Sequence, residues 1–220
     1  MNNDSIMLML RDGTAELHGI AEKQPFQRAL ICGEITREGY AAYLGQMFVI
    51  HSSLEAGLAR CSEPVVRRIV TGEQFQAGNL KSDLAVLGDF ATPQATPAAL
   101  MLTEAIDASH DAASLLGHLY VLEGSKNGNA FVARAIRRAL NLTAGTGDRY
   151  LDPHGPEQRP IWAAFKARMD GEQWTSQQRD DMLAAARMMF SAIVDLSAEL
   201  EVVRQRHAIP TNDIPLNLTR

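Results

Sequence analysis

The chain has 220 residues, 46% of them hydrophobic, and a formal net charge of −5 at pH 7. This length fits one domain with room for a core and a ligand, and the weakly acidic balance disfavours nucleic acid as a partner. The first residues lack the charge and apolar run of a secretory signal, and the longest nearly uncharged segment, YAAYLGQMFVI, is too short to cross a bilayer. Cys32 and Cys61 have neither a metal-type spacing nor a disulfide pattern. We therefore expect a cytoplasmic protein with reduced thiols and no membrane partner.

Hydrophobic residues recur with a helical period along almost the whole chain, and strand-like alternation is nearly absent. The pattern predicts helices over residues 4–23, 36–60 with Thr36 as N-cap, 65–71, 74–88, 97–109, 112–141, 161–170 and 175–206. Residues 25–33 are expected to connect the first two helices, and the Gly/Pro-rich segment 143–160 is a long loop of a kind that is often functional. We expect a single all-α domain over residues 1–206 and an irregular tail at 207–220.

A polar stripe crosses the otherwise apolar first helix. Arg11, Thr14, His18 and Glu22 share one face, since Arg11 and His18 are seven residues apart, which is about 10 Å along a helix axis. One ring nitrogen of His18 could ligate a metal while Glu22 orients the other, and Arg11 could pair with an anionic group of the same ligand. The spacing suits equally a half-buried histidine with ion-pairing neighbours, so the stripe alone leaves both interpretations open.

The second unusual segment, GHLYVLEGSKNGNAFVARAI, is a strongly helical stretch with three interior glycines. Gly117, Gly124 and Gly128 lie seven and four residues apart and share one face, although each costs a helix about 1 kcal/mol relative to alanine. Either a large flat ligand approaches the backbone there, with Ser125 and Asn129 as small hydrogen-bonding groups beside it, or another helix crosses closely on a small-residue stripe.

Other kinds of site find little support. The sequence lacks a Glu-x-x-His pair, an H-E-x-x-H motif, a Walker-type loop and a G-x-S-x-G elbow. The remaining histidines are more readily explained as satisfied or exposed side chains; they are His51, His110, His118, His154 and His207. The basic run of Arg134, Arg137 and Arg138 is typical of a solvated face, with docking of an acidic redox protein as the alternative.

Together these segments resemble the heme oxygenase family, specifically its bacterial branch, over about residues 10–200. LRDGTAELHGIAE is similar to the family's proximal helix, in which a histidine followed by an Ala-Glu pair binds heme iron, and LYVLEGSKNGN is similar to its glycine-rich distal helix. YAAYLGQMFVIHSSLE and IWAAFKARMD resemble two further helices, the second of them near the heme edge. The resemblance implies a helical domain that holds heme between the proximal and distal helices.

The resemblance also implies the chemistry and the residues that perform it. The implied reaction opens heme to biliverdin, carbon monoxide and ferrous iron, with dioxygen and an external electron donor such as ferredoxin, flavodoxin or a reductase, so that heme is both cofactor and substrate. The product would serve iron acquisition or a bilin-accepting photoreceptor. Eight residues are assigned to the heme site: His18 as axial iron ligand with Glu22 beside it, Arg11 and Lys166 at the propionates, and Gly124, Ser125, Gly128 and Asn129 on the distal side.

Several positions depart from the family pattern. The family's paired distal glycines read Gly128-Asn129 here, Lys126 and Asn127 replace smaller or apolar residues, and Ser125 stands where some members carry a water-organising aspartate. A non-catalytic heme- or bilin-binding protein, or a scaffold that has lost its ligand, therefore stays open beside the oxygenase.

Overall fold

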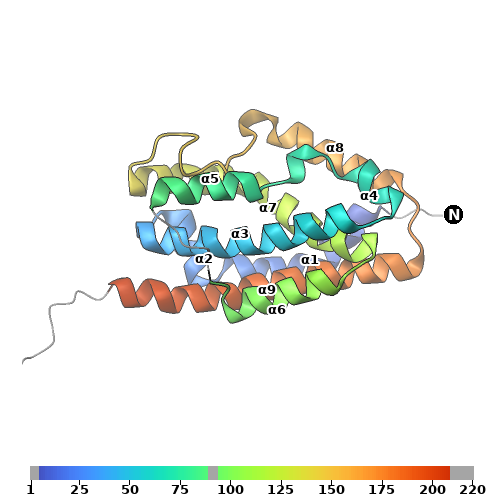
Figure 1. The fold of residues 1–220 in the computed structure, drawn as a ribbon, viewed down its shortest axis with the longest axis horizontal. Coiled ribbons are helices and arrows are strands. Elements are labelled where there is room, and N and C mark those ends of the chain that lie inside the picture. Colours follow the sequence, from blue (N-terminus) through green and yellow to red (C-terminus); the bar gives the residue numbers. More distant parts are fainter. Residues whose placement is uncertain (1–4, 89–93, 209–220) are drawn as a thin grey trace, which may run out of the picture.

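The computed structural model describes residues 5–88 and 94–208, and the side chains of 5–88 and 94–205. All regular elements within these ranges are helices, so the predicted all-α fold is confirmed. The helices α3, α6 and α9 lie side by side along the long axis of the molecule (Figure 1). None of the helices in the described ranges combines the length and the apolarity that spanning a bilayer requires.

The chain forms nine α-helices and two short 3-10 helices within the described residues. The α-helices are α1 (Ile6–Glu22), α2 (Pro25–Cys32), α3 (Arg37–Arg60), α4 (Pro64–Ile69), α5 (Ala77–Leu87), α6 (Pro97–Ala108), α7 (Ala112–Leu140), α8 (Gln158–Gly171) and α9 (Ser176–Ala208), and the 3-10 helices are η1 (Gly72–Gln74) and η2 (Gly155–Glu157). The predicted cap of α3 is confirmed, since the Thr36 hydroxyl accepts from the backbone N–H of Gly39.

The predicted connection over residues 25–33 is wrong, because most of it is the helix α2. Pro25 occupies the first helical position, where its missing N–H has no intrahelical partner to lose. Gly33 ends the helix with a φ of 73°, in the left-handed region that glycine adopts readily. Proline and glycine here begin and end a helix instead of marking a loop.

Other boundaries differ from the prediction by a few residues. The helix predicted over residues 74–88 begins only at Ala77, as α5, and Gln74 is the last residue of η1, while the helix predicted over residues 65–71 ends at Ile69. The helix α8 begins three residues before the predicted start at Ile161, with Pro160 in its first turn, where proline is tolerated. The helix α9 runs to Ala208, two residues beyond the predicted end at Arg206, and the predicted tail from residue 209 onward lies outside the described residues.

The long helix α9 is packed along both α1 and α7. Gly117 permits the close approach of α7 to α9, because a Cβ at this position would lie 2.2 Å from the carbonyl oxygen of Met182. The helices α1 and α7 scarcely touch each other. A cavity lies between them instead.

Candidate functional site

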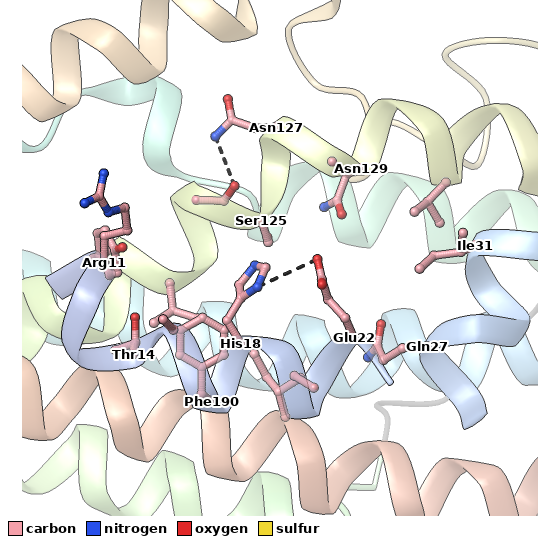
Figure 2. A pocket seen from close by; sticks show the side chains of 18 of the residues that line it. Arg11, Thr14, His18, Glu22, Gln27, Ile31, Ser125, Asn127, Asn129 and Phe190 are labelled. Carbon is pink, nitrogen blue, oxygen red and sulfur yellow. Dashed lines mark hydrogen bonds and ion pairs between the residues drawn. The ribbon is translucent and has the colours of Figure 1, made fainter. Parts of the chain in front are cut away.

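The cavity between α1 and α7 has a volume of about 780 Å³ (Figure 2). The helices α1 and α7 supply most of its lining, and α2, α8 and α9 contribute the remaining side chains. Small-molecule sites commonly enclose about 300–1,000 Å³. The cavity is therefore large enough for a ligand of cofactor size.

His18 lines the cavity from the middle of α1, and its side chain is 55% exposed. Its Nδ1 lies 3.7 Å from Oε1 of Glu22, one turn further along the helix (Figure 2). Phe190 of α9 packs against the imidazole edge-on, with ring centroids 5.5 Å apart and an interplanar angle of 75°. Because Glu22 engages Nδ1 and Phe190 supports the ring, Nε2 is the nitrogen available to a ligand.

The three glycines of α7 divide between two roles. Gly117 lies at the crossing with α9, so for this residue the close-crossing interpretation holds. Gly124 and Gly128 line the cavity instead. A Cβ on Gly124 would meet only Trp162, at 3.8 Å, and a Cβ on Gly128 would meet nothing within 4 Å outside its own helix. The backbone of α7 is therefore open to a ligand at Gly124 and Gly128.

Two polar side chains of α7 line the cavity on the side of α1, whereas that of Asn127 points away from α1 (Figure 2). Ser125 and Asn129 lie opposite His18 and Glu22 in Figure 2. The Ser125 hydroxyl donates to the carbonyl oxygen of Leu122 at 2.8 Å, one turn back on its own helix. Asn129 is half-buried and directs its amide toward the cavity. All four residues assigned to the distal side thus line the same cavity as His18.

Arg11 marks one end of the cavity, near Tyr120 and Trp162. Its Nε donates to Oδ1 of Asp12 at 2.8 Å, and this hydrogen bond is the main reason that the pKa of Arg11 lies above its usual value. Lys166 of α8 does not line the cavity. Its Nζ lies 5.8 Å from the ring centroid of Trp162, whose side chain does. This end of the cavity is cationic and aromatic.

The opposite end of the cavity is apolar. Ile31 of α2 and Phe131 of α7 line it and are 50% and 69% exposed. Ile31 lies far from Arg11 in Figure 2, with His18 and Glu22 between them. A ligand with an anionic edge and an apolar body matches this division of charge.

Sequence reasoning missed the contributions of α2 and α9 to the lining, and it predicted that of α8 from residues 161–170. Gln27 and Ile31 come from α2, which was predicted as a connection; the sequence signals that could have revealed it are Pro25 and Gly33. Phe190 comes from α9, and Trp162 lies in α8. Nothing in the local pattern of α9 distinguishes Phe190 from a core residue.

Two of the remaining histidines with described side chains are buried away from the cavity. His51 is 1% exposed, and burial, with a further contribution from Lys126, lowers its pKa to about 3. Its Nε2 lies 3.4 Å from the Tyr150 hydroxyl. Burial likewise lowers the pKa of His118 to about 4. Both are neutral near pH 7, and in the described part of the chain no group of three or more metal-ligating side chains gathers.

These features define a class of helical proteins that hold a ligand between two helices, with one histidine on one side and an open glycine backbone on the other. A metal held by a single histidine must bring most of its own ligands, as iron does in a porphyrin. The chain belongs to the heme oxygenase family, whose model, described as Heme oxygenase, matches residues 4–199.

Individual relatives are distant in sequence and similar in fold. Heme oxygenase 1 of Homo sapiens is 23% identical over 202 residues, which cover 87% of this chain and 70% of the human protein. The crystal structure of heme oxygenase-1 from the cyanobacterium Synechocystis sp. PCC 6803 in complex with heme superposes with a TM-score of 0.84 at 17% identity, covering 93% of this chain and 96% of that one. A domain of unknown function with a heme oxygenase-like fold from Shewanella denitrificans has a TM-score of 0.67 at 16% identity and covers 97% of both chains.

Proposed function

We propose that this protein is an active heme oxygenase of the bacterial branch, which opens heme to biliverdin, carbon monoxide and ferrous iron with dioxygen and external electrons. The observation that carries the proposal is that His18 and the open backbone at Gly124 and Gly128 line one cavity from opposite helices. The residues present fit heme, because an imidazole nitrogen is available on one side and a Cβ-free surface on the other.

The proximal side binds and orients heme. His18 binds the iron through Nε2, while Glu22 holds the imidazole through Nδ1, directly or through a water across their 3.7 Å separation. Arg11 pairs with a propionate at the cationic end, and Lys166 reaches a second one when it leaves the face of Trp162. Ile31 and Phe131 shield the apolar edge of the macrocycle from water.

The distal side limits the room beside bound heme and holds the water that delivers protons. Bound heme supplies both the iron that activates dioxygen and the ring carbon that is oxidised. Gly124 and Gly128 would let the backbone of α7 lie close to the macrocycle. This close approach would exclude bulk water and restrict the positions open to dioxygen. Ser125 and Asn129 provide a hydroxyl and an amide that would bind and orient water in the cavity, and this water would carry the protons.

The electron donor docks on the protein surface. A ferredoxin, a flavodoxin or a reductase could deliver the electrons that the reaction requires. The product biliverdin serves iron release or the supply of a bilin to a photoreceptor. In this proposal the protein acts in the cytoplasm, where its free cysteines stay reduced.

A spectroscopic titration tests the proposal. Purified protein is mixed with one equivalent of hemin, and its absorbance is followed before and after addition of a reductant, with catalase present and under air. The proposal expects a six-coordinate heme band that decays into the broad red absorption of biliverdin. Failure to form any heme band in folded protein overturns it.

A non-catalytic heme- or bilin-binding protein is the second candidate. It is favoured by Asn129 in place of the second distal glycine, and by the existence of a similar fold whose function is unknown. In the same titration this candidate expects the heme band to form and to persist under reductant and oxygen.

A further inference from the structure

A buried ion pair lies on the back of the distal helix. Glu123 and Lys126 of α7, three residues apart, pair with each other and are 0% and 2% exposed. Neither lines the cavity, but each is next in sequence to a residue that does, Gly124 for Glu123 and Ser125 for Lys126. The pair therefore belongs to the same turns of α7 that cover His18, on the opposite face.

Hydrogen bonds join the ion pair to the short helix η1. The Nζ of Lys126 donates to the carbonyl oxygen of Glu73 at 3.1 Å, and the Nε2 of Gln74 donates to Oε2 of Glu123 at 3.4 Å. Gln74 is 1% exposed and is itself held, because its Oε1 accepts from the backbone N–H of Thr71 at 2.8 Å. His154, from the segment before η2, lies 3.1 Å from the same Glu73 carbonyl. Polar contacts thus connect α7 to η1 and, through the Glu73 carbonyl, to the segment before η2.

Several charged and titratable groups face this pair. Burial raises the pKa of Glu123 and lowers that of Lys126, and each charge opposes the shift of its partner. Carboxylates of Glu55 and Glu73 also favour the charged form of Lys126, and Arg168 favours that of Glu123. A buried ion pair is often no more stabilising than apolar side chains of the same volume. Net stability alone therefore does not explain why this ion pair is buried here.

The cavity side of α7 cannot supply the same support. Gly124 and Gly128 present no side chain toward α1, and a Cβ on Gly128 would meet no neighbour within 4 Å. Residues 124–129 are consequently held in place by contacts on their other faces, and interior glycines make this part of the helix easier to deform.

We propose that Glu123 and Lys126, bonded to η1, are positioning residues that hold residues 124–129 of α7 at a set distance from His18. The pair acts through the backbone of α7 and touches no ligand. The positioning of residues 124–129 does not depend on the proposed function. Its consequence, a fixed depth of the heme cavity, rests on that function.

Amide hydrogen exchange in the ligand-free protein tests the positioning directly. In the double variant E123L/K126L the two charges are removed together, so neither is left buried without its partner. The proposal expects exchange at residues 124–129 to rise about tenfold, with α1 unchanged and the melting temperature unchanged or higher. A purely structural pair predicts the reverse, a lower melting temperature without a local rise in exchange, and this result overturns the proposal.

Two further variants complete the test. Arg137→Gln breaks an ion pair between α7 and Asp148 of the segment that follows it, 2.5 Å long and outside residues 124–129, and should leave exchange at 124–129 unchanged. Gln74→Met removes one of the two hydrogen bonds between η1 and the pair while keeping the pair itself, and should raise that exchange even if the double variant does not fold. Unchanged exchange in Gln74→Met and in any folded E123L/K126L protein overturns the proposal.

A measurement with heme separates this proposal from the proposed function. Where wild-type protein binds hemin, the double variant should retain the heme band but change its affinity for added imidazole about tenfold, because imidazole must fit beneath α7. If wild-type protein binds no hemin, the proposed function fails while the exchange result still decides the positioning role. An imidazole affinity identical to wild type contradicts control of the cavity depth.

Discussion

The Nδ1 of His18 lies 3.7 Å from a carboxylate oxygen of Glu22, one turn along the same helix and at the edge of the same cavity. The carboxylate can hold the imidazole in one orientation and increase its basicity, as acidic partners of metal-bound histidines commonly do. Both side chains are more than half exposed, so solvent screening keeps the interaction weaker than in a closed site.

Replacing Glu22 by glutamine tests this relationship. Loss of the carboxylate should weaken hemin binding about tenfold and leave a six-coordinate spectrum, because His18 is still present. Hemin titration monitored by absorbance measures the change. Glu16→Gln, an exposed carboxylate of α1 that does not line the cavity, is the matched control and should bind hemin like the wild type.

Replacing His18 by alanine should weaken hemin binding by at least about 100-fold, since no other histidine with a described side chain lines the cavity. Added imidazole should restore the heme band by filling the space of the missing ring. His110→Ala removes a histidine outside the cavity and should have no effect. Unchanged hemin affinity in His18→Ala would show that another group is the ligand.

The glycines of α7 should respond in opposite ways to substitution. Gly117→Ala should destabilise the protein by about 1–3 kcal/mol, because its Cβ would collide with the backbone of Met182 on α9. Gly128→Leu should keep or raise the free energy of unfolding, since its Cβ meets no neighbour and leucine favours helix, but should abolish hemin binding by filling the cavity. Thermal unfolding and hemin titration of both variants separate the two effects, and a Gly128→Leu protein that still binds hemin normally contradicts the site.

His51 should make the protein sensitive to mild acid. Its pKa is lowered to about 3 in the folded protein and is about 6.5 when unfolded, so the unfolded chain takes up a proton first as the pH falls. The stability from neutral His51 is complete above pH about 6.5 and is lost as the pH falls toward about 3. Between pH 6.5 and pH 5 this loss is about 2 kcal/mol.

The variant His51→Gln measures this contribution. Urea unfolding of wild type and variant at several pH values should give curves that differ in slope between pH 6.5 and pH 5, with the variant losing less stability. Contributions from carboxylates that do not contact His51 cancel in the difference, and the neighbouring one is Glu55, 3.8 Å from Nδ1. Parallel curves would mean that His51 is accessible to protons in the folded state.

Sequence alone determined the helical class, the position of most helices and the two helix faces that carry most of the candidate site. Helical periodicity and caps such as Thr36 are local signals that tertiary packing did not override. Residues separated by whole turns must share a face, so Arg11, His18 and Glu22 had to line one side of α1, as Gly124 and Gly128 had to on α7.

Only the tertiary structure decided which partner each face meets. Gly117 and Gly128 share a face in the sequence pattern, yet one meets the backbone of α9 and the other meets open space. The contact of Phe190 with His18 and the contact of Lys126 with η1 are likewise contacts between distant segments. Such contacts depend on how whole helices pack, and a helical period specifies that a face is buried or small without specifying what lies against it.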